Sequence, residues 1–321
     1  MSGGRPALIA DIGGTNARFA LVGSDGEPTG TRVLACADYP GLAVAARAYL
    51  DLERPDPAPD RAAIAVASPV VGDRISMTNR DWSFSIPELR AALGLGQLRV
   101  VNDFTAQALA VPRLDAGETH RIGGGTAISG APIAILGPGT GLGVSGLVEA
   151  PGGGCIALAT EGGHATLAPA DARERAVVGA LAARFGHVSI ERAVSGPGLG
   201  NLALAIAAVD GLDRAALEPD EVTTRALADV DPVAVEALSM FCAMLGGAAG
   251  NLALTLGARG GVYIGGGIVR RLGGFLEASP FRARFEDKGR FRDYLSAIPT
   301  SVITAENSAL RGLTALLEQG G

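Results

Sequence analysis

The chain has 321 residues, which is long enough for two domains. Hydrophobic residues make up 48% and charged residues 19% of it, which is the composition of a folded globular protein. Its formal net charge of -6 disfavours a nucleic-acid partner, because phosphate backbones are bound by basic surfaces. Lys288 is the only lysine, which excludes a Walker A loop, since that loop needs a lysine after its glycines.

Two short strands are predicted at 7–11 and 17–22, joined by the tight glycine turn in the segment ADIGGTNARFALV, residues 10–22. Glycines allow a ligand to approach the backbone closely, and the free N–H groups of such a turn can bind an anion without a lysine. An ordinary glycine hairpin is the alternative. We expect Asp11 to face a magnesium ion, directly or through water. The expected phosphate-binding residues are Gly13, Gly14, Thr15 and Asn16.

Strands and helices alternate in the next part of the chain. A helix is expected at 41–52, a strand at 62–68, a helix at 86–93 with Ser85 as its N-cap, a strand at 98–102 and a helix at 104–111. This alternation predicts an α/β fold whose parallel or mixed sheet is covered by helices on both faces. Asn102 and Asp103 lie where the strand at 98–102 ends and the next helix begins, which is where ligands bind in α/β sheets, although an aspartate there can also cap the helix.

A second domain is expected beyond Val111 and Pro112. The segment APIAILGPGTGLGVSGLV, residues 131–148, repeats the pattern of the opening: an apolar strand, a glycine-threonine turn and another apolar strand. The repeat predicts two related domains that face each other across a cleft, each with a phosphate-binding turn. In this second turn the candidates are Gly139, Thr140 and Gly141.

The apolar run at 237–258 is predicted to be a buried helix, not a membrane span, because Asn251 and a pair of glycines interrupt it. A strand that ends in glycines follows at 260–269. The spacing of a dinucleotide fingerprint is not cleanly present there. We therefore expect Gly265 and Gly266 to form a platform against the adenosine of a nucleotide.

Six motifs occur in an order and spacing that resembles the bacterial glucokinase family of the actin, hexokinase and heat-shock-70 ATPase superfamily. They are DIGGTNARFAL, NDFTAQALA, LGPGTGLGVSGL, TEGGHATLAP, ERAVSGPGLGNL and GGVYIGGGIV. The resemblance implies two actin-like (ribonuclease H-like) α/β domains with mixed sheets flanked by helices and an active site in the interdomain cleft. The small domain is expected at 1–111 plus 302–321 and the large domain at 112–301. A homodimer is implied, and the absence of a cysteine-rich zinc motif points to the zinc-free branch.

The resemblance also implies an activity, the transfer of the γ-phosphoryl group of ATP, with Mg²⁺, to the 6-hydroxyl of glucose. Asp103 matches the catalytic base of the family, and a carboxylate near its ordinary pKa of about 4 is expected to suffice. The glycines between Glu161 and His164 disfavour the helix that a di-iron E-x-x-H site requires. The positions that match sugar contacts are Asn102, Glu161, His164 and Glu191, with Asn79 as a weaker candidate that can equally be a turn residue.

Two alternatives stay open: a kinase of another hexose, and a non-catalytic sugar sensor. A transcription regulator is disfavoured because the first strand begins near Ala7, which leaves no room for a helix-turn-helix. Cys36, Cys155 and Cys242 lie far apart and form no C-x-x-C pair, so they are interpreted as reduced thiols of a cytoplasmic protein. No signal peptide and no membrane partner are expected.

Overall fold

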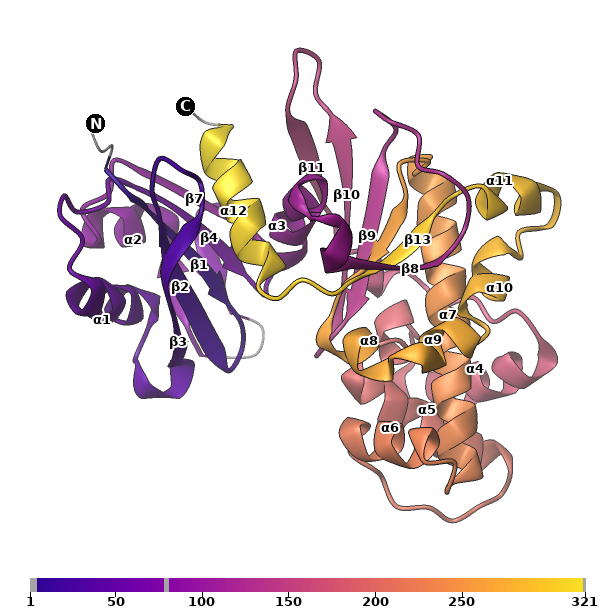
Figure 1. Ribbon diagram of the computed structural model, residues 1–321. Coiled ribbons are helices and arrows are strands. Elements are labelled where there is room, and N and C mark those ends of the chain that lie inside the picture. The colour runs from indigo at the N-terminus through magenta and orange to yellow at the C-terminus, as the bar shows by residue number, and fades with distance from the viewer. Residues whose placement is uncertain (1–4, 78–80, 320–321) are drawn as a thin grey trace. The chain divides into compact units, whose positions relative to one another are not determined.

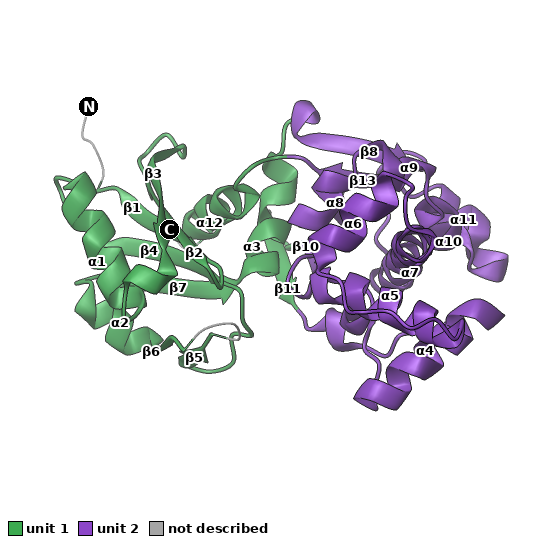
Figure 2. Cartoon of the chain, turned by 90° about the horizontal axis from the view of Figure 1, so that it is seen from below, with its two compact units in different colours: residues 1–115, 150–159, 305–321 green, residues 116–149, 160–304 purple. Residues whose placement is uncertain are grey.

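The computed structural model describes residues 5–77 and 81–319, and the chain divides into two compact units (Figure 2). Unit 1 comprises residues 1–115, 150–159 and 305–321, and unit 2 comprises residues 116–149 and 160–304. Asn79, a predicted sugar contact, lies outside the described residues. Both units are therefore built from segments that are distant in the sequence.

Unit 1 contains a mixed sheet in the order β3-β2-β1-β4-β7 (Figure 1). β1 pairs antiparallel with β2 and parallel with β4, and β4 pairs parallel with β7. The strands of this unit are β1 (Ala7–Ile12), β2 (Asn16–Val22), β3 (Pro28–Ala35), β4 (Arg61–Val66), β5 (Arg74–Ser76), β6 (Ser83–Ser85), β7 (Gln97–Asn102) and β11 (Cys155–Ala159). The predicted strands at 7–11 and 17–22 are confirmed, with the glycine turn between them.

The helices of unit 1 cover this sheet. They are α1 (Leu42–Glu53), α2 (Ile86–Ala92), α3 (Asp103–Ala110) and α12 (Ser308–Glu318). Ser85 caps α2 as predicted, because its hydroxyl accepts a hydrogen bond from the Glu88 N–H at 3.4 Å. α12 comes from the end of the chain and packs closely on α3 (Figure 1). A core that includes Phe19, Tyr49 and Ile64 lies between the sheet and the helices.

Unit 2 repeats the strand connections of unit 1. Its strands lie in the order β10-β9-β12-β13-β8, with β9 antiparallel to β10 and parallel to β12, which is parallel to β13. Their bounds are β8 (Thr119–Gly123), β9 (Ile133–Pro138), β10 (Leu142–Glu149), β12 (Val262–Ile264) and β13 (Thr300–Ile303). The repeat seen in the sequence is thus a repeat of sheet topology: an antiparallel hairpin followed by two parallel strands.

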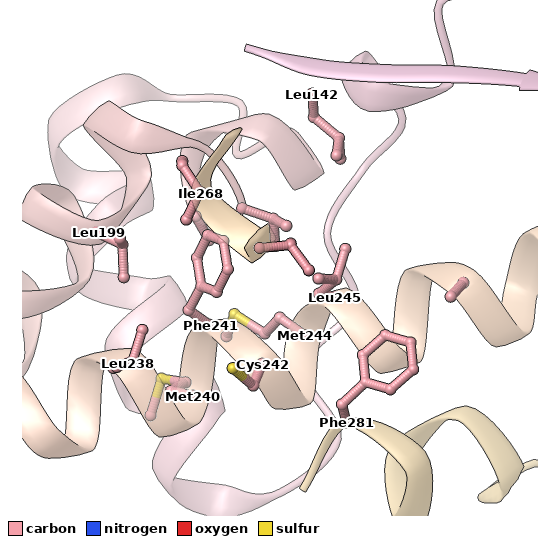
Figure 3. Close-up of a cluster of buried hydrophobic side chains, with 14 of the residues drawn as sticks. Leu142, Leu199, Leu238, Met240, Phe241, Cys242, Met244, Leu245, Ile268 and Phe281 are labelled. Atoms are coloured by element: carbon pink, nitrogen blue, oxygen red, sulfur yellow. The ribbon is translucent and has the colours of Figure 1, made fainter. Parts of the chain in front are cut away.

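A layer of helices gives unit 2 its large core. They are α4 (Ala172–Phe185), α5 (Gly196–Val209), α6 (Pro219–Leu227), α7 (Pro232–Leu256), α8 (Gly267–Leu272), α9 (Gly274–Ala278), α10 (Phe281–Glu286) and α11 (Arg292–Ser296). Phe241, Met244 and Leu245 of α7 lie among Leu199 and Ile268 (Figure 3). Within the described part of the chain, α7 is the one helix long and apolar enough to cross a membrane. Since 72% of its apolar window is buried in the protein, the prediction of a buried helix is confirmed.

Candidate active site

The candidate residues of unit 1 gather at the carboxyl edge of its sheet. Ile12 of β1 pairs with Val66 of β4, and Val66 pairs with Asn102 of β7, so the three parallel strands end level. Asp11, the turn at 13–16, Asn102 and Asp103 all belong to this edge. Ligands bind at such an edge because the strand-to-helix connections leave backbone and side-chain groups open to solvent.

The turn at 13–16 is held in place by hydrogen bonds, and its residues Thr15 and Asn16 face solvent. The Gly13 N–H donates to the Asn16 carbonyl at 2.9 Å and closes the turn. The Cys36 N–H donates to the Thr15 carbonyl at 2.9 Å, and the Cys36 thiol lies 3.7 Å from the Gly13 carbonyl. Thr15 and Asn16 are exposed. Cys36 therefore supports the turn, a role that the spacing of the cysteines did not indicate.

Asn102, and not Asp103, caps α3. The Asn102 Oδ1 accepts from the Phe104 N–H at 2.9 Å and its Nδ2 donates to the Ser68 carbonyl at 3.4 Å. Asp103 is the first residue of the helix, and its Oδ1 shares the Phe104 N–H at 2.9 Å. Helix capping therefore does not by itself account for an aspartate at position 103.

The electrostatic environment of Asp103 corrects one expectation. Burial and the neighbouring charge of Asp11 together raise the pKa of Asp103 to about 7, against hydrogen bonds from backbone N–H groups and from Asn102 that lower it. Burial also raises the pKa of Asp11, while Arg18, whose Nη1 lies 3.4 Å from the Asp11 Oδ2, lowers it. The prediction of an ordinary carboxyl pKa at Asp103 is wrong, because two carboxylates share a poorly solvated site.

The turn at 139–141 in unit 2 is tied to its surroundings at both ends. The Gly139 N–H donates to the Gly141 carbonyl at 2.8 Å, and the Gly139 carbonyl accepts from the Gly196 N–H at 2.7 Å. At the other end, the Leu142 N–H donates to the Glu191 Oε2 at 2.8 Å. A Cβ on Gly141 would lie 2.5 Å from the same carboxylate oxygen, so a larger residue here would displace the Glu191 side chain.

Gly265 and Gly266 lie beside this turn. The parallel pairing of β12 with β9 ends here, where the Gly265 N–H donates to the Leu136 carbonyl at 2.9 Å. Gly266 has a φ of 92°, and a Cβ there would lie 2.3 Å from the Pro138 carbonyl oxygen. The backbone at Gly265 and Gly266 therefore packs directly against the end of β9, where the turn at 139–141 begins.

Glu161 directly precedes the 3-10 turn η4 (Gly162–His164), which ends with His164 and packs against β10. A Cβ on Gly163 would lie 2.1 Å from the Leu142 carbonyl oxygen, so η4 can lie this close only with glycine. Ala165, directly after η4, accepts a hydrogen bond from the N–H of Ile190 at 2.9 Å. This bond brings η4 next to η5 (Ile190–Arg192), which carries Glu191.

The side chains of Glu161 and His164 are exposed at the end of unit 2 where the turn at 139–141 lies. Among residues 5–77 and 81–319, no group of three or more His, Cys, Asp or Glu side chains is arranged to hold a metal ion. The structure thus brings together two sets of predicted residues, one in each unit. Unit 1 holds Asp11, Gly13, Gly14, Thr15, Asn16, Asn102 and Asp103, and unit 2 holds Gly139, Thr140, Gly141, Glu161, His164, Glu191, Gly265 and Gly266.

Comparison with known proteins gives consistent matches along nearly the whole chain. The model of the glucokinase family matches residues 8–320. A protein named glucokinase from Aromatoleum aromaticum is 57% identical over 314 residues, which cover 98% of this chain and 95% of that protein. The crystal structure of a glucokinase from an Antarctic psychrotroph matches with a TM-score of 0.88 and 38% identity, covering 98% of this chain and 99% of that one.

A more distant match extends the likeness of fold. A ROK family glucokinase from Streptomyces griseus, solved in complex with glucose and AMPPNP, has a TM-score of 0.63 and 21% identity, covering 98% of this chain and all (100%) of that one. The expected fold, an actin-like α/β protein with two mixed sheets flanked by helices, is confirmed by these structures.

Proposed function

The chain belongs to the glucokinase family and is an enzyme that phosphorylates glucose, and we propose that the acceptor is the 6-hydroxyl of the sugar and that Asp103 is the general base. The observation that carries the proposal is the position of Asp103 at the carboxyl edge of the unit 1 sheet, with a pKa raised to about 7. A general base works best when its pKa lies near the pH at which the enzyme operates.

The sugar is recognised by groups that match its ring hydroxyls. Each hydroxyl is both a donor and an acceptor, so carboxylates, amides and an imidazole can bind it in a defined orientation. We assign this role to Glu161, His164 and Glu191 of unit 2 and to Asn102 of unit 1. Asn79 remains a further candidate on sequence grounds.

ATP is proposed to bind through the backbone of three glycine segments. The turns at 13–16 and 139–141 hold the β- and γ-phosphates, and Gly265 with Gly266 lies against the adenosine. Asp11 fits a Mg²⁺ ligand, since its carboxylate is 24% exposed beside the first turn and Mg²⁺ takes one or two carboxylates and several waters. When bound, the ion supplies neutralisation of the phosphate charges.

The chemistry asks the protein mainly to position the reactants. Phosphoryl transfer needs little covalent work, so aligning the hydroxyl with the phosphorus and excluding water dominate catalysis. Asp103 accepts the proton of the 6-hydroxyl as the phosphoryl group is transferred, which requires its carboxylate to be ionised beforehand. We further propose that the two units correspond to a small domain and a large domain, and that the enzyme acts in the cytoplasm as a homodimer.

The test is Asp103→Asn, which keeps the shape of the side chain and removes the base. The turnover number kcat should fall by about 10²–10⁴, while the KM for glucose stays within about tenfold of the wild-type value. Asp51→Asn, at an exposed position of α1, is the matched control and should leave both values unchanged. Near-normal turnover of Asp103→Asn would refute the assignment of the base.

A panel of sugars in an ADP-release assay tests the alternative acceptor. A kinase that prefers another hexose would have a higher kcat/KM for that sugar than for glucose.

A further inference from the structure

We infer that Glu191 is a positioning residue that couples sugar binding to the phosphate-binding turn at 139–141, so that glucose raises the affinity of unit 2 for the nucleotide. The inference rests on the proposed role of Glu191 as a sugar contact and adds a second role for the same carboxylate. One of its oxygens supports the turn, and the other is left for the sugar.

The contact between Glu191 and the turn is direct. The Oε2 accepts from the Leu142 N–H at 2.8 Å, at the point where the turn becomes β10. The carboxylate also fills the space beside Gly141, where a Cβ would come within 2.5 Å of this oxygen. For the Oε1, no hydrogen-bond partner is found among residues 5–77 and 81–319.

The backbone of Glu191 is anchored on the same side. Its carbonyl accepts from the Ser195 hydroxyl at 2.8 Å, and this hydroxyl in turn accepts from the Gly198 N–H at 3.0 Å at the start of α5. The next residue, Gly196, donates to the Gly139 carbonyl at 2.7 Å. The segment 191–196 therefore holds both ends of the turn, one through backbone and one through the Glu191 side chain.

The two attachments differ in rigidity. The backbone attachment is fixed by α5, whereas the Glu191 attachment depends on several rotatable side-chain bonds. A sugar hydroxyl bound to the Oε1 would fix these bonds and thereby the Leu142 N–H and the turn. The turn at 139–141 is then already ordered before the phosphates bind, so nucleotide binding loses less conformational entropy and is tighter. By linkage, the bound nucleotide raises the affinity for glucose by the same factor.

The experiment measures the affinity of Mg²⁺–AMPPNP by calorimetry, with and without saturating glucose. In the wild-type enzyme, glucose should strengthen AMPPNP binding by about fivefold or more. Glu191→Asp keeps the charge but is one methylene shorter, so it cannot reach the Leu142 N–H and the sugar together. In this variant, saturating glucose should raise the affinity for AMPPNP by less than about twofold. Glu191→Gln keeps the length and an oxygen for the Leu142 N–H, and should retain the wild-type strengthening although glucose itself binds more weakly.

Glu161→Gln is the control, because Glu161 contacts the sugar in our proposal but makes no hydrogen bond to the turn among the described residues. It should lower the affinity for glucose, while the increase in AMPPNP affinity caused by saturating glucose should equal that of the wild-type enzyme. The coupling would be overturned if glucose raised the AMPPNP affinity of Glu191→Asp as much as that of the wild-type enzyme, or did not raise that of the wild-type enzyme at all. Either result would leave the proposed function intact. Unchanged glucose affinity in both Glu191 variants would instead remove Glu191 from the sugar site, and with it the basis of the inference.

Discussion

At the scale of single residues, the pairing of Asp103 with Asp11 links activity to pH. Asp103 must be ionised to accept a proton, and its pKa is raised to about 7 by burial and by the charge of Asp11. We expect kcat/KM for glucose to fall by about tenfold for each pH unit below 7. Asp11→Asn removes the neighbouring charge, so the residual activity should show this fall at a lower pH. A pH–rate profile of both proteins checks this, and an unshifted profile would contradict it.

The raised pKa of Asp103 also predicts that Asp103→Asn, although it removes the proposed base, makes the protein more stable. Because the folded state holds the proton of Asp103 more tightly than the unfolded state, stability is lost as the pH rises from about 4 through 7. Asp103→Asn has no charge to bury and should melt at least about 2 °C above the wild-type protein at pH 8. The difference should vanish near pH 4. Equal melting temperatures at pH 8 would show that the charged carboxylate is well solvated.

At the scale of elements, the contact between α12 and α3 positions the proposed base. A Cβ on Gly312 of α12 would lie 1.7 Å from the Ala106 carbonyl oxygen of α3, the helix that begins with Asp103. Gly312→Ala must push the helices apart, so the free energy of unfolding should fall by about 1–3 kcal/mol and kcat should fall with it. Denaturant unfolding and a steady-state assay measure the two effects.

The control for this variant is another helical glycine. Gly179 of α4 has open space where a Cβ would be placed. Gly179→Ala should therefore raise the free energy of unfolding by about 0.4–1 kcal/mol, through the smaller entropy of the unfolded chain, and leave kcat unchanged. If both alanine variants behaved alike, close packing of α12 on α3 would not be the cause.

A buried ion pair joins α4 to α10 in unit 2. The Glu174 carboxylate, on a residue only 3% exposed, accepts from both terminal nitrogens of Arg284 at 2.6 and 3.1 Å, and from the Ala170 N–H at 2.7 Å. Glu174→Gln leaves the guanidinium without its counter-charge and should lower the free energy of unfolding by about 3–5 kcal/mol. Arg173→Gln, which breaks partly exposed ion pairs one residue earlier, should cost about 1 kcal/mol or less by the same unfolding measurement.

At the scale of the whole molecule, the proposed function draws on residues of both units. The residues proposed to contact the ring hydroxyls, Glu161, His164 and Glu191, belong to unit 2, and the proposed base Asp103 belongs to unit 1. Xylose has the ring hydroxyls but lacks the 6-hydroxymethyl group. It should therefore compete with glucose without being phosphorylated.

Glu161→Gln should weaken both sugars alike, by about tenfold or more, because a lost hydrogen bond to a charged group costs about 1.5–3 kcal/mol. The KM for glucose and the inhibition constant for xylose test this. Unchanged values for both sugars would exclude Glu161 from the sugar site.

The sequence by itself determined what depends on near neighbours along the chain. The hairpin around Gly13, the Ser85 cap of α2 and the repeated strand-turn-strand pattern follow from glycine conformation, side-chain capping and hydrophobic periodicity, which all act over a few residues. The repeat and the six motifs were also sufficient to identify the fold and the family.

Only the tertiary structure decided the features that join distant segments. The pKa of Asp103 depends on its burial and on Asp11, the Leu142 N–H is bound by Glu191, and residues 150–159 belong to unit 1. Spacing along the chain could not reveal these relations, because solvation and charge act through space, and which groups meet is decided by how the strands and helices pack.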